Sequence, residues 1–150
     1  MDPVAHRQHA AALDAFPACD VLVMAAAVAD FRPVEALAGK IDKSAHDSLV
    51  VRMEPTVDIL ATVGASRRPG QVLVGFAAEH GAAGLERARA KRTRKNVDVI
   101  VHNDVSIPGI GFEGGDNAVT IIGPDGETAT GRVSKAECAQ AILDAVERLV

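Results

Sequence analysis

The most constraining feature of the sequence is the run VLVMAAAVADFRP, from Val21 to Pro33. Its first part, Val21 to Ala27, is apolar at every position, which is typical of a strand covered on both faces by helices. The run then stops on an acid, an aromatic ring, an arginine and a proline. Ligands of open α/β sheets bind outside the carboxyl ends of the strands, and the motif KIDK, Lys40 to Lys43, follows in the next segment. The pattern predicts a phosphorylated ligand or a nucleotide at the end of this strand.

Strands alternate with helices along the rest of the chain. The apolar spacing predicts helices at residues 4–16, 56–65, 85–95 and 134–150. Thr56 is the expected N-cap of the second helix, and Ser134 with Glu137 forms a capping box at the last. Strands are predicted at residues 21–27, 49–53, 71–76, 97–102 and 117–122. This alternation indicates one α/β domain over residues 1–150, a parallel sheet with right-handed crossovers, and a loop or flap within residues 31–55.

Composition excludes several classes of protein. The net charge of −4 argues against broad affinity for nucleic acids or membrane surfaces. The chain has no run near the ~20 apolar residues of a membrane span and no signal-peptide pattern, so a cytoplasmic location is expected. Cys19 and Cys138 are expected to be reduced thiols, and the five histidines lack zinc-ligand spacing. The segment GIGFEG (109–114) neither directly follows a strand nor opens a helix, so it is rejected as a dinucleotide fingerprint.

Three predicted strands end in polar clusters. The clusters are Asp30-Phe31-Arg32, Phe76 with Glu79, and Asn103-Asp104. Because the carboxyl ends of parallel strands share one rim of a sheet, we expect the clusters to converge on one site. A carboxylate such as Asp30 can bind a ribose hydroxyl or a Mg²⁺ ion that carries phosphates. Lys91 and Lys95 lie one helical turn apart and can act together on one anion.

Each of these features also has an ordinary structural explanation. Asp30 can be a helix cap, and Lys40 and Lys43 can be solvated surface charges rather than phosphate ligands in a closing flap. Phe76 can belong to the core. The basic run from Arg87 to Lys95 can be a solvated helix face, and it can also be read as a nucleic-acid surface.

Seven segments in chain order resemble the phosphopantothenoylcysteine synthetases, the CoaB part of bacterial bifunctional coenzyme A biosynthesis flavoproteins. They are AAAVADFRP, KIDK, PTVDIL, VGFAAE, KRTRKNVDVIVHNDVS, GF…DNAVTII and SK…AILD. The resemblance implies a Rossmann-like fold, a homodimer and a ligase that joins 4′-phosphopantothenate to L-cysteine. It implies CTP as a substrate with Mg²⁺, an acyl-cytidylate intermediate, and no flavin in this chain.

The resemblance also assigns roles to individual residues. It places Met24, Ala25 and Ala26 at the strand-end backbone that contacts the nucleotide, and Asp30 on the ribose or metal side. Lys40 matches the catalytic flap lysine that meets the triphosphate, Phe76 the cytosine site, and Lys91 with Lys95 the triphosphate lysines. Phe31, Lys43 and Asn103 are further candidates within the matching motifs.

The sequence departs from the family pattern in two places. Asp42 stands where the family usually has another lysine. No segment of the type NxSSGKMG, which holds the 4′-phosphopantothenate phosphate in the family, is present. We therefore expect an N-terminally truncated ligase domain, inactive alone, whose missing half is lost or comes from a separate chain. The alternatives are a non-catalytic nucleotide-binding or dimerisation module, an NAD(P)-binding oxidoreductase domain and a basic-helix nucleic-acid binder.

Overall fold

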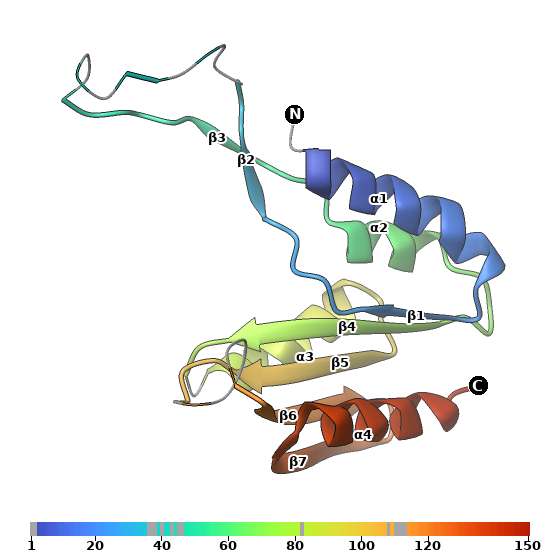
Figure 1. Ribbon diagram of the computed structural model, residues 1–150. Helices are drawn as coiled ribbons and strands as arrows, with labels where there is room; N and C mark the ends of the chain where they lie inside the picture. Colours follow the sequence, from blue (N-terminus) through green and yellow to red (C-terminus); the bar gives the residue numbers. More distant parts are fainter. Residues whose placement is uncertain are drawn as a thin grey trace.

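The computed structural model describes residues 3–35, 39, 41–42, 44, 47–81, 83–107, 109 and 114–150. Its body is a sheet with helices on both faces, from which a narrow two-stranded arm extends (Figure 1). The helices are α1 (Pro3–Ala15), α2 (Ile59–Ser66), α3 (Gly84–Arg94) and α4 (Lys135–Glu147), and a short 3₁₀ turn, η1 (Phe16–Ala18), follows α1. The predicted Rossmann-like α/β fold is confirmed.

The central sheet has five strands in the order β1-β4-β5-β6-β7. They are β1 (Val21–Met24), β4 (Val72–Glu79), β5 (Val99–Asp104), β6 (Asp116–Gly123) and β7 (Gly126–Ser134). Strands β1, β4 and β5 are parallel, as predicted, but β6 and β7 are antiparallel, so the sheet is mixed. Since a parallel neighbour needs a crossover of a dozen or more residues, the 11-residue segment 105–115 that joins β5 to β6 favours an antiparallel return.

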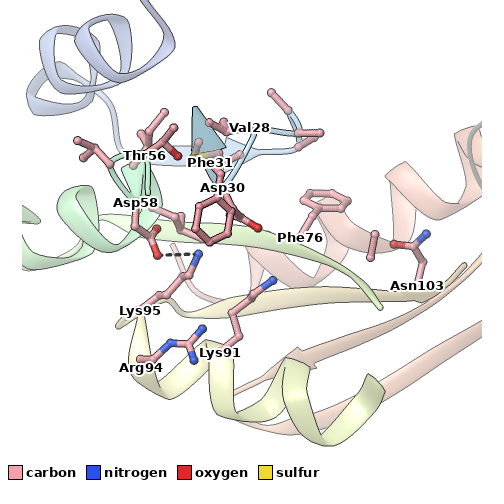
Figure 2. A pocket seen from close by; sticks show the side chains of 18 of the residues that line it. Val28, Asp30, Phe31, Thr56, Asp58, Phe76, Lys91, Arg94, Lys95 and Asn103 are labelled. Atoms are coloured by element: carbon pink, nitrogen blue, oxygen red, sulfur yellow. Dashed lines mark ion pairs between the residues drawn. The ribbon is translucent and has the colours of Figure 1, made fainter. Parts of the chain in front are cut away.

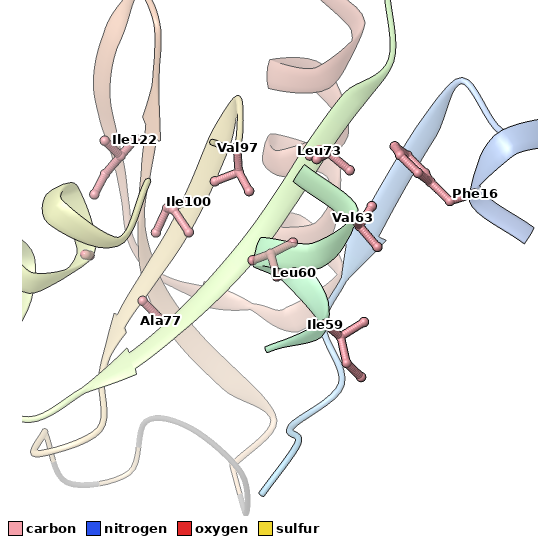
Figure 3. Packing of buried hydrophobic residues seen from close by; sticks show 10 residues of the cluster. Phe16, Ile59, Leu60, Val63, Leu73, Ala77, Val97, Ile100 and Ile122 are labelled. Atoms are coloured by element: carbon pink, nitrogen blue, oxygen red, sulfur yellow. The ribbon is translucent and has the colours of Figure 1, made fainter. Parts of the chain in front are cut away.

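Two apolar clusters hold the layers together. On one face, Phe16, Leu60 and Val63 of η1 and α2 pack against Leu73 and Ile100 of the sheet (Figure 3). On the other face, side chains of α4 cover the alternate residues of the same strands; they include Cys138, Ile142 and Val146. The aliphatic strand sequences are therefore buried on both faces in β4 and β5, as the continuous apolar pattern requires.

Strand β1 differs from its prediction. It ends at Met24, three residues early, and it is only half-buried, with Val23 42% exposed. Within the described part of the chain, β1 pairs only with β4, and the apolar run does not distinguish such a position from the middle of a sheet. Because the strand ends early, Ala25, Ala26 and Ala27 are free to line a surface at its carboxyl end.

Helix α2 also begins later than predicted. Asp58, not Thr56, is its N-cap, and a side-chain oxygen of Asp58 accepts a hydrogen bond from the Ala61 N–H at 3.0 Å. The Thr56 hydroxyl instead donates to the carbonyl of Ala29 at 2.5 Å. Both residue types are good N-caps, so local preference could not separate them. The predicted capping box of α4 is confirmed, with both the Ser134 and Glu137 bonds present.

The arm consists of β2 (Phe31–Pro33) paired antiparallel with β3 (Met53–Pro55). An ion pair between Arg32 Nη2 and Glu54 Oε1 at 2.7 Å joins its two strands. The strand predicted at residues 49–53 lies too early by several positions, since only Met53 belongs to β3. Strand β7 was not predicted, because residues 126–134 are polar and mostly exposed and lack the apolar alternation of a half-buried strand.

Candidate functional site

A cleft of about 1020 Å³ lies at the carboxyl ends of the parallel strands. Its walls come from the end of β1, the segment before α2, the last turns of α3, the ends of β4 and β5, and the starts of β6 and α4 (Figure 2). Nine of the sequence-predicted site residues line this cleft: Met24, Ala25, Ala26, Asp30, Phe31, Phe76, Lys91, Lys95 and Asn103. The predicted convergence of three strand ends on one rim is therefore found in the structure.

The segment before α2 fixes the acidic wall of the cleft. The backbone N–H of Thr56 donates to the carbonyl of Asp30 at 2.9 Å, and its hydroxyl donates to the neighbouring carbonyl of Ala29. These two bonds hold the turn between β1 and β2 against the start of α2. The Asp30 side chain thereby lies at the cleft, next to the exposed ring of Phe31 (Figure 2).

Helix α3 supplies the cationic wall. Lys91, Arg94 and Lys95 all line the cleft from its last turns and the residue that follows it. A close approach to α2 positions this end of α3, because the side-chain amide of Asn96 donates to the carbonyl of Gly64 at 3.0 Å. Three cationic side chains on one wall, spaced three and four residues apart, are suited to a multiply charged anion.

Two acids balance these cations. Lys95 Nζ lies 3.0 Å from Asp58 Oδ2, and Lys91 Nζ lies 3.7 Å from Glu79 Oε1. Arg87 Nε also donates to Glu79, at 2.7 Å. Among the described residues, no acid forms an ion pair within 4.0 Å of the Arg94 guanidinium.

Both acids are held in the ionised form. Partial burial raises the pKa of Asp58, but the hydrogen bond from the Ala61 N–H and the Lys95 ammonium outweigh it, so the net pKa is lowered. Burial likewise raises the pKa of Glu79, and its bond from Arg87 and the charge of Lys91 lower it by more. Asp58 therefore faces the three cations of the cleft as a carboxylate at neutral pH, and Glu79 pairs with Lys91 from outside the cleft lining.

The opposite end of the cleft is less charged. Phe76 stands between the α3 wall and Asn103 (Figure 2). Asn117 and Lys135 also line the cleft. Phe76 is only partly buried, so its ring offers a flat apolar surface beside amide groups. An aromatic face next to amide donors and acceptors is suited to a heterocyclic base.

The remaining predicted residues, Lys40 and Lys43, lie outside the described residues, and their roles stay predictions. Among the charged and amide side chains of the cleft, sequence reasoning missed four: Asp58, Arg94, Asn117 and Lys135. Arg94 falls within the same helical run as the two predicted lysines, and that spacing could have indicated it.

In the described part of the chain, no group of three or more histidines, cysteines or acids could hold a metal ion by itself. No described helix is long and apolar enough to cross a membrane.

Comparisons with known proteins agree on one family. The chain matches the DNA/pantothenate metabolism flavoprotein C-terminal domain over residues 4–149. It is 39% identical over 132 residues to the coenzyme A biosynthesis bifunctional protein CoaBC of Vibrio parahaemolyticus, covering 87% of this chain and 33% of that protein. It is 41% identical over 112 residues to a cysteine/cysteine sulfinic acid decarboxylase from an unknown prokaryotic organism, covering 75% of this chain and 31% of that protein.

A solved structure supports the same assignment. The crystal structure of the C-terminal domain of a CoaBC protein superposes with a TM-score of 0.74 at 32% identity, covering 97% of this chain and 62% of that one. The chain spans about a third of the length of the curated relatives that it matches. The chain belongs to the family of DNA/pantothenate metabolism flavoprotein C-terminal domains.

Proposed function

We propose that this chain is the nucleotide-binding part of a phosphopantothenate–cysteine ligase of coenzyme A biosynthesis, which uses CTP and Mg²⁺. The observation that carries the proposal is the cleft, where an acid, an aromatic ring and three cations meet at the ends of parallel strands. The names of the CoaBC relatives place them in coenzyme A biosynthesis and support the pathway.

The residues of the cleft fit the parts of a nucleoside triphosphate. Lys91, Arg94 and Lys95 bind the polyphosphate, and the ring of Phe76 supports the base. Asp30 faces the ribose or the magnesium ion. Mg²⁺ is commonly held by one or two carboxylates together with substrate phosphates rather than by an all-protein cage, so a single acid at this position is sufficient.

In the proposed reaction, the carboxylate of 4′-phosphopantothenate attacks the α-phosphorus of CTP and pyrophosphate leaves. The amine of L-cysteine then attacks the acyl-cytidylate carbonyl, forms the amide and releases CMP. The cationic wall of α3 stabilises the charge that develops on the leaving pyrophosphate, and catalysis consists mainly of positioning and charge neutralisation. Lys40 is the proposed flap residue that closes over the triphosphate.

The second candidate is a non-catalytic nucleotide-binding or dimerisation module. It is favoured by the apolar side chains exposed on the arm and just before β3, among them Phe31 (57% exposed), Val51 (51%) and Met53 (49%). We propose that these side chains contact a second copy of the chain in a cytoplasmic homodimer, or a separate chain that completes the substrate site. Mass measurement in solution tests the dimer.

Calorimetric titration with CTP and Mg²⁺ tests the nucleotide site. The variant Lys91→Gln should bind CTP about tenfold more weakly, the loss expected for one charge-assisted bond to phosphate. The control is Arg89→Gln, which removes the same charge from α3 at a residue that pairs with Glu127 outside the cleft. A folded chain that binds no CTP, or that loses affinity equally in both variants, would contradict the proposal.

Activity tests the catalytic proposal. Formation of 4′-phosphopantothenoylcysteine by the purified chain, with CTP, 4′-phosphopantothenate and cysteine, supports the ligase and contradicts the expectation that the chain is inactive alone. Saturable CTP binding without product is expected both of a ligase part that is inactive alone and of a non-catalytic module; product that forms only when a chain with the missing substrate segment is added favours the ligase part. Substitution of ATP for CTP measures the base selectivity that we assign to the Phe76 end of the cleft.

A further inference from the structure

Asp58 connects two structural roles through its two carboxylate oxygens. Oδ1 accepts the hydrogen bond from the Ala61 N–H that caps α2, and Oδ2 pairs with the Lys95 ammonium at 3.0 Å. The pair joins the segment before α2 to the end of α3, across the cleft wall shown in Figure 2. The Asp58 carboxylate is therefore already paired with the lysine that an incoming anion would contact.

We propose that Asp58 is a positioning residue that acts as an internal counter-ion of the cleft. It holds Lys95 while the cleft is empty and limits the affinity for polyphosphate, so that the pyrophosphate product can leave. The inference rests on the proposed function in two respects: the α3 wall binds a polyphosphate, and pyrophosphate is the product that leaves.

Burial and charge explain why Asp58 should compete with an anion for Lys95 more than it helps to position Lys95 for binding. The Lys95 side chain is only 16% exposed, so packing along its stem restrains it even without Asp58. Asp58 is 47% exposed on its side-chain atoms and lines the cleft, so its negative charge faces the space that phosphates would enter. Bonds from the Ala61 N–H and Lys95 keep its pKa low, so this repulsion persists at neutral pH.

Glu79 provides a useful contrast. It lies 3.7 Å from Lys91, a longer separation, it is held by Arg87 at 2.7 Å, and it does not line the cleft. The charge of Glu79 is therefore held by Arg87 and Lys91 of α3, outside the cleft lining. Of the two acids that pair with the cleft lysines, only Asp58 stands in the path of the ligand.

Three substitutions of Asp58 separate its charge from its cap. Asn and Ser remove the charge and keep an acceptor for the Ala61 N–H, whereas Ala removes both. We expect all three variants to bind inorganic tripolyphosphate roughly three- to tenfold more tightly than the unmodified chain, the effect of one charge across a partly solvated gap. Thermal stability should instead be lower in the Ala variant than in the Asn and Ser variants, because only Ala loses the hydrogen bond that caps α2.

Calorimetry with tripolyphosphate, without Mg²⁺ and at several salt concentrations, makes the measurement. The gain in affinity of Asp58→Asn should shrink as salt rises, since screening acts on the repulsion and not on the cap. Glu127→Gln is the matched control, because it also removes an acid paired with a cation of α3, but outside the cleft. Its affinity for tripolyphosphate should not change.

Several results would overturn the inference. Unchanged tripolyphosphate binding by Asp58→Asn would mean that the carboxylate does not compete for Lys95, and weaker binding would mean that it supports Lys95. If Asp58→Asn bound CTP more weakly only when Mg²⁺ is present, Asp58 would be a metal ligand instead. If the unmodified chain binds tripolyphosphate but not CTP, the proposed function fails and the role of Asp58 stands; if it binds neither, both fail.

Discussion

The contact between α2 and the end of α3 depends on the missing side chain of Gly64. A Cβ atom at this position would lie less than 3.0 Å from the backbone carbonyl oxygen of Lys95 and 3.3 Å from that of Asn96. Real Cβ atoms essentially never approach another atom so closely, and backbone oxygens cannot turn away as a side chain can. In Gly64→Ala, the two elements must therefore separate, and Lys95 must move with the chain that carries it.

The cost follows from two opposing effects. Overpacking of this kind costs about 1–3 kcal/mol, and the backbone contact places Gly64→Ala near the upper end. Alanine recovers about 0.5–1 kcal/mol, because glycine inside a helix is less favourable. The net loss of unfolding free energy is about 2 kcal/mol, which corresponds to a fall of roughly 4–8 °C in the unfolding temperature of a domain this size.

Calorimetric or circular-dichroism melting of Gly64→Ala checks this value. Gly123→Ala is the neutral control, because the nearest atom to a Cβ there is 4.0 Å away. Gly75→Ala is intermediate: its Cβ would meet the side chains of Leu60 and Ile100, whose ends can shift. Unfolding of Gly64→Ala at or above the temperature of the unmodified chain would refute the reasoning, as would a loss no larger than that of Gly123→Ala.

Two further substitutions test the capping and the core. Ser134→Ala removes the hydroxyl of the α4 capping box and should lower the unfolding free energy by about 1 kcal/mol in urea titrations. Hydrogen bonds from the Ser134 side chain and N–H lower the pKa of Glu137. The stability that these bonds contribute is complete above the usual glutamate pKa and is lost as pH falls through the lowered pKa. The loss of stability in acid should therefore be smaller in Ser134→Ala. Leu73→Ala empties a fully buried position between helix and sheet and should cost about 2–5 kcal/mol, and a smaller loss would mean that the core collapses around it.

The strand ends were predictable because their sequence signal is local. A continuous apolar run that stops on polar residues marks both a buried strand and its carboxyl end, and parallel pairing brings such ends together. This is why Asp30, Phe76 and Asn103, which are far apart in the sequence, could be assigned to one cleft before its geometry was known. The capping box at Ser134 was predictable for the same reason, since its spacing lies within one turn.

The parts that sequence reasoning missed depend on contacts between distant segments. Thr56 and Asp58 are both good N-caps, and only the packing of Thr56 against the β1–β2 turn decides between them. Strand β7 is polar and exposed, so no apolar pattern marks it in the sequence. It forms because it pairs with β6, to which a two-residue turn joins it. Val23 is half-exposed because β1 pairs on one side within the described residues, a position that composition does not encode.

The same distinction explains why the cations of the site were easier to find than their counter-ions. The helical spacing of Lys91 and Lys95 indicates in the sequence that they act together, whereas the acid that pairs with Lys95 lies 37 residues earlier, at the start of another helix. That pairing exists because Gly64 lets α2 and the end of α3 approach closely, which carries Lys95 towards Asp58. The charge balance of the cleft is therefore a consequence of helix packing, and a substitution at Gly64 should alter polyphosphate binding even though this residue does not line the cleft.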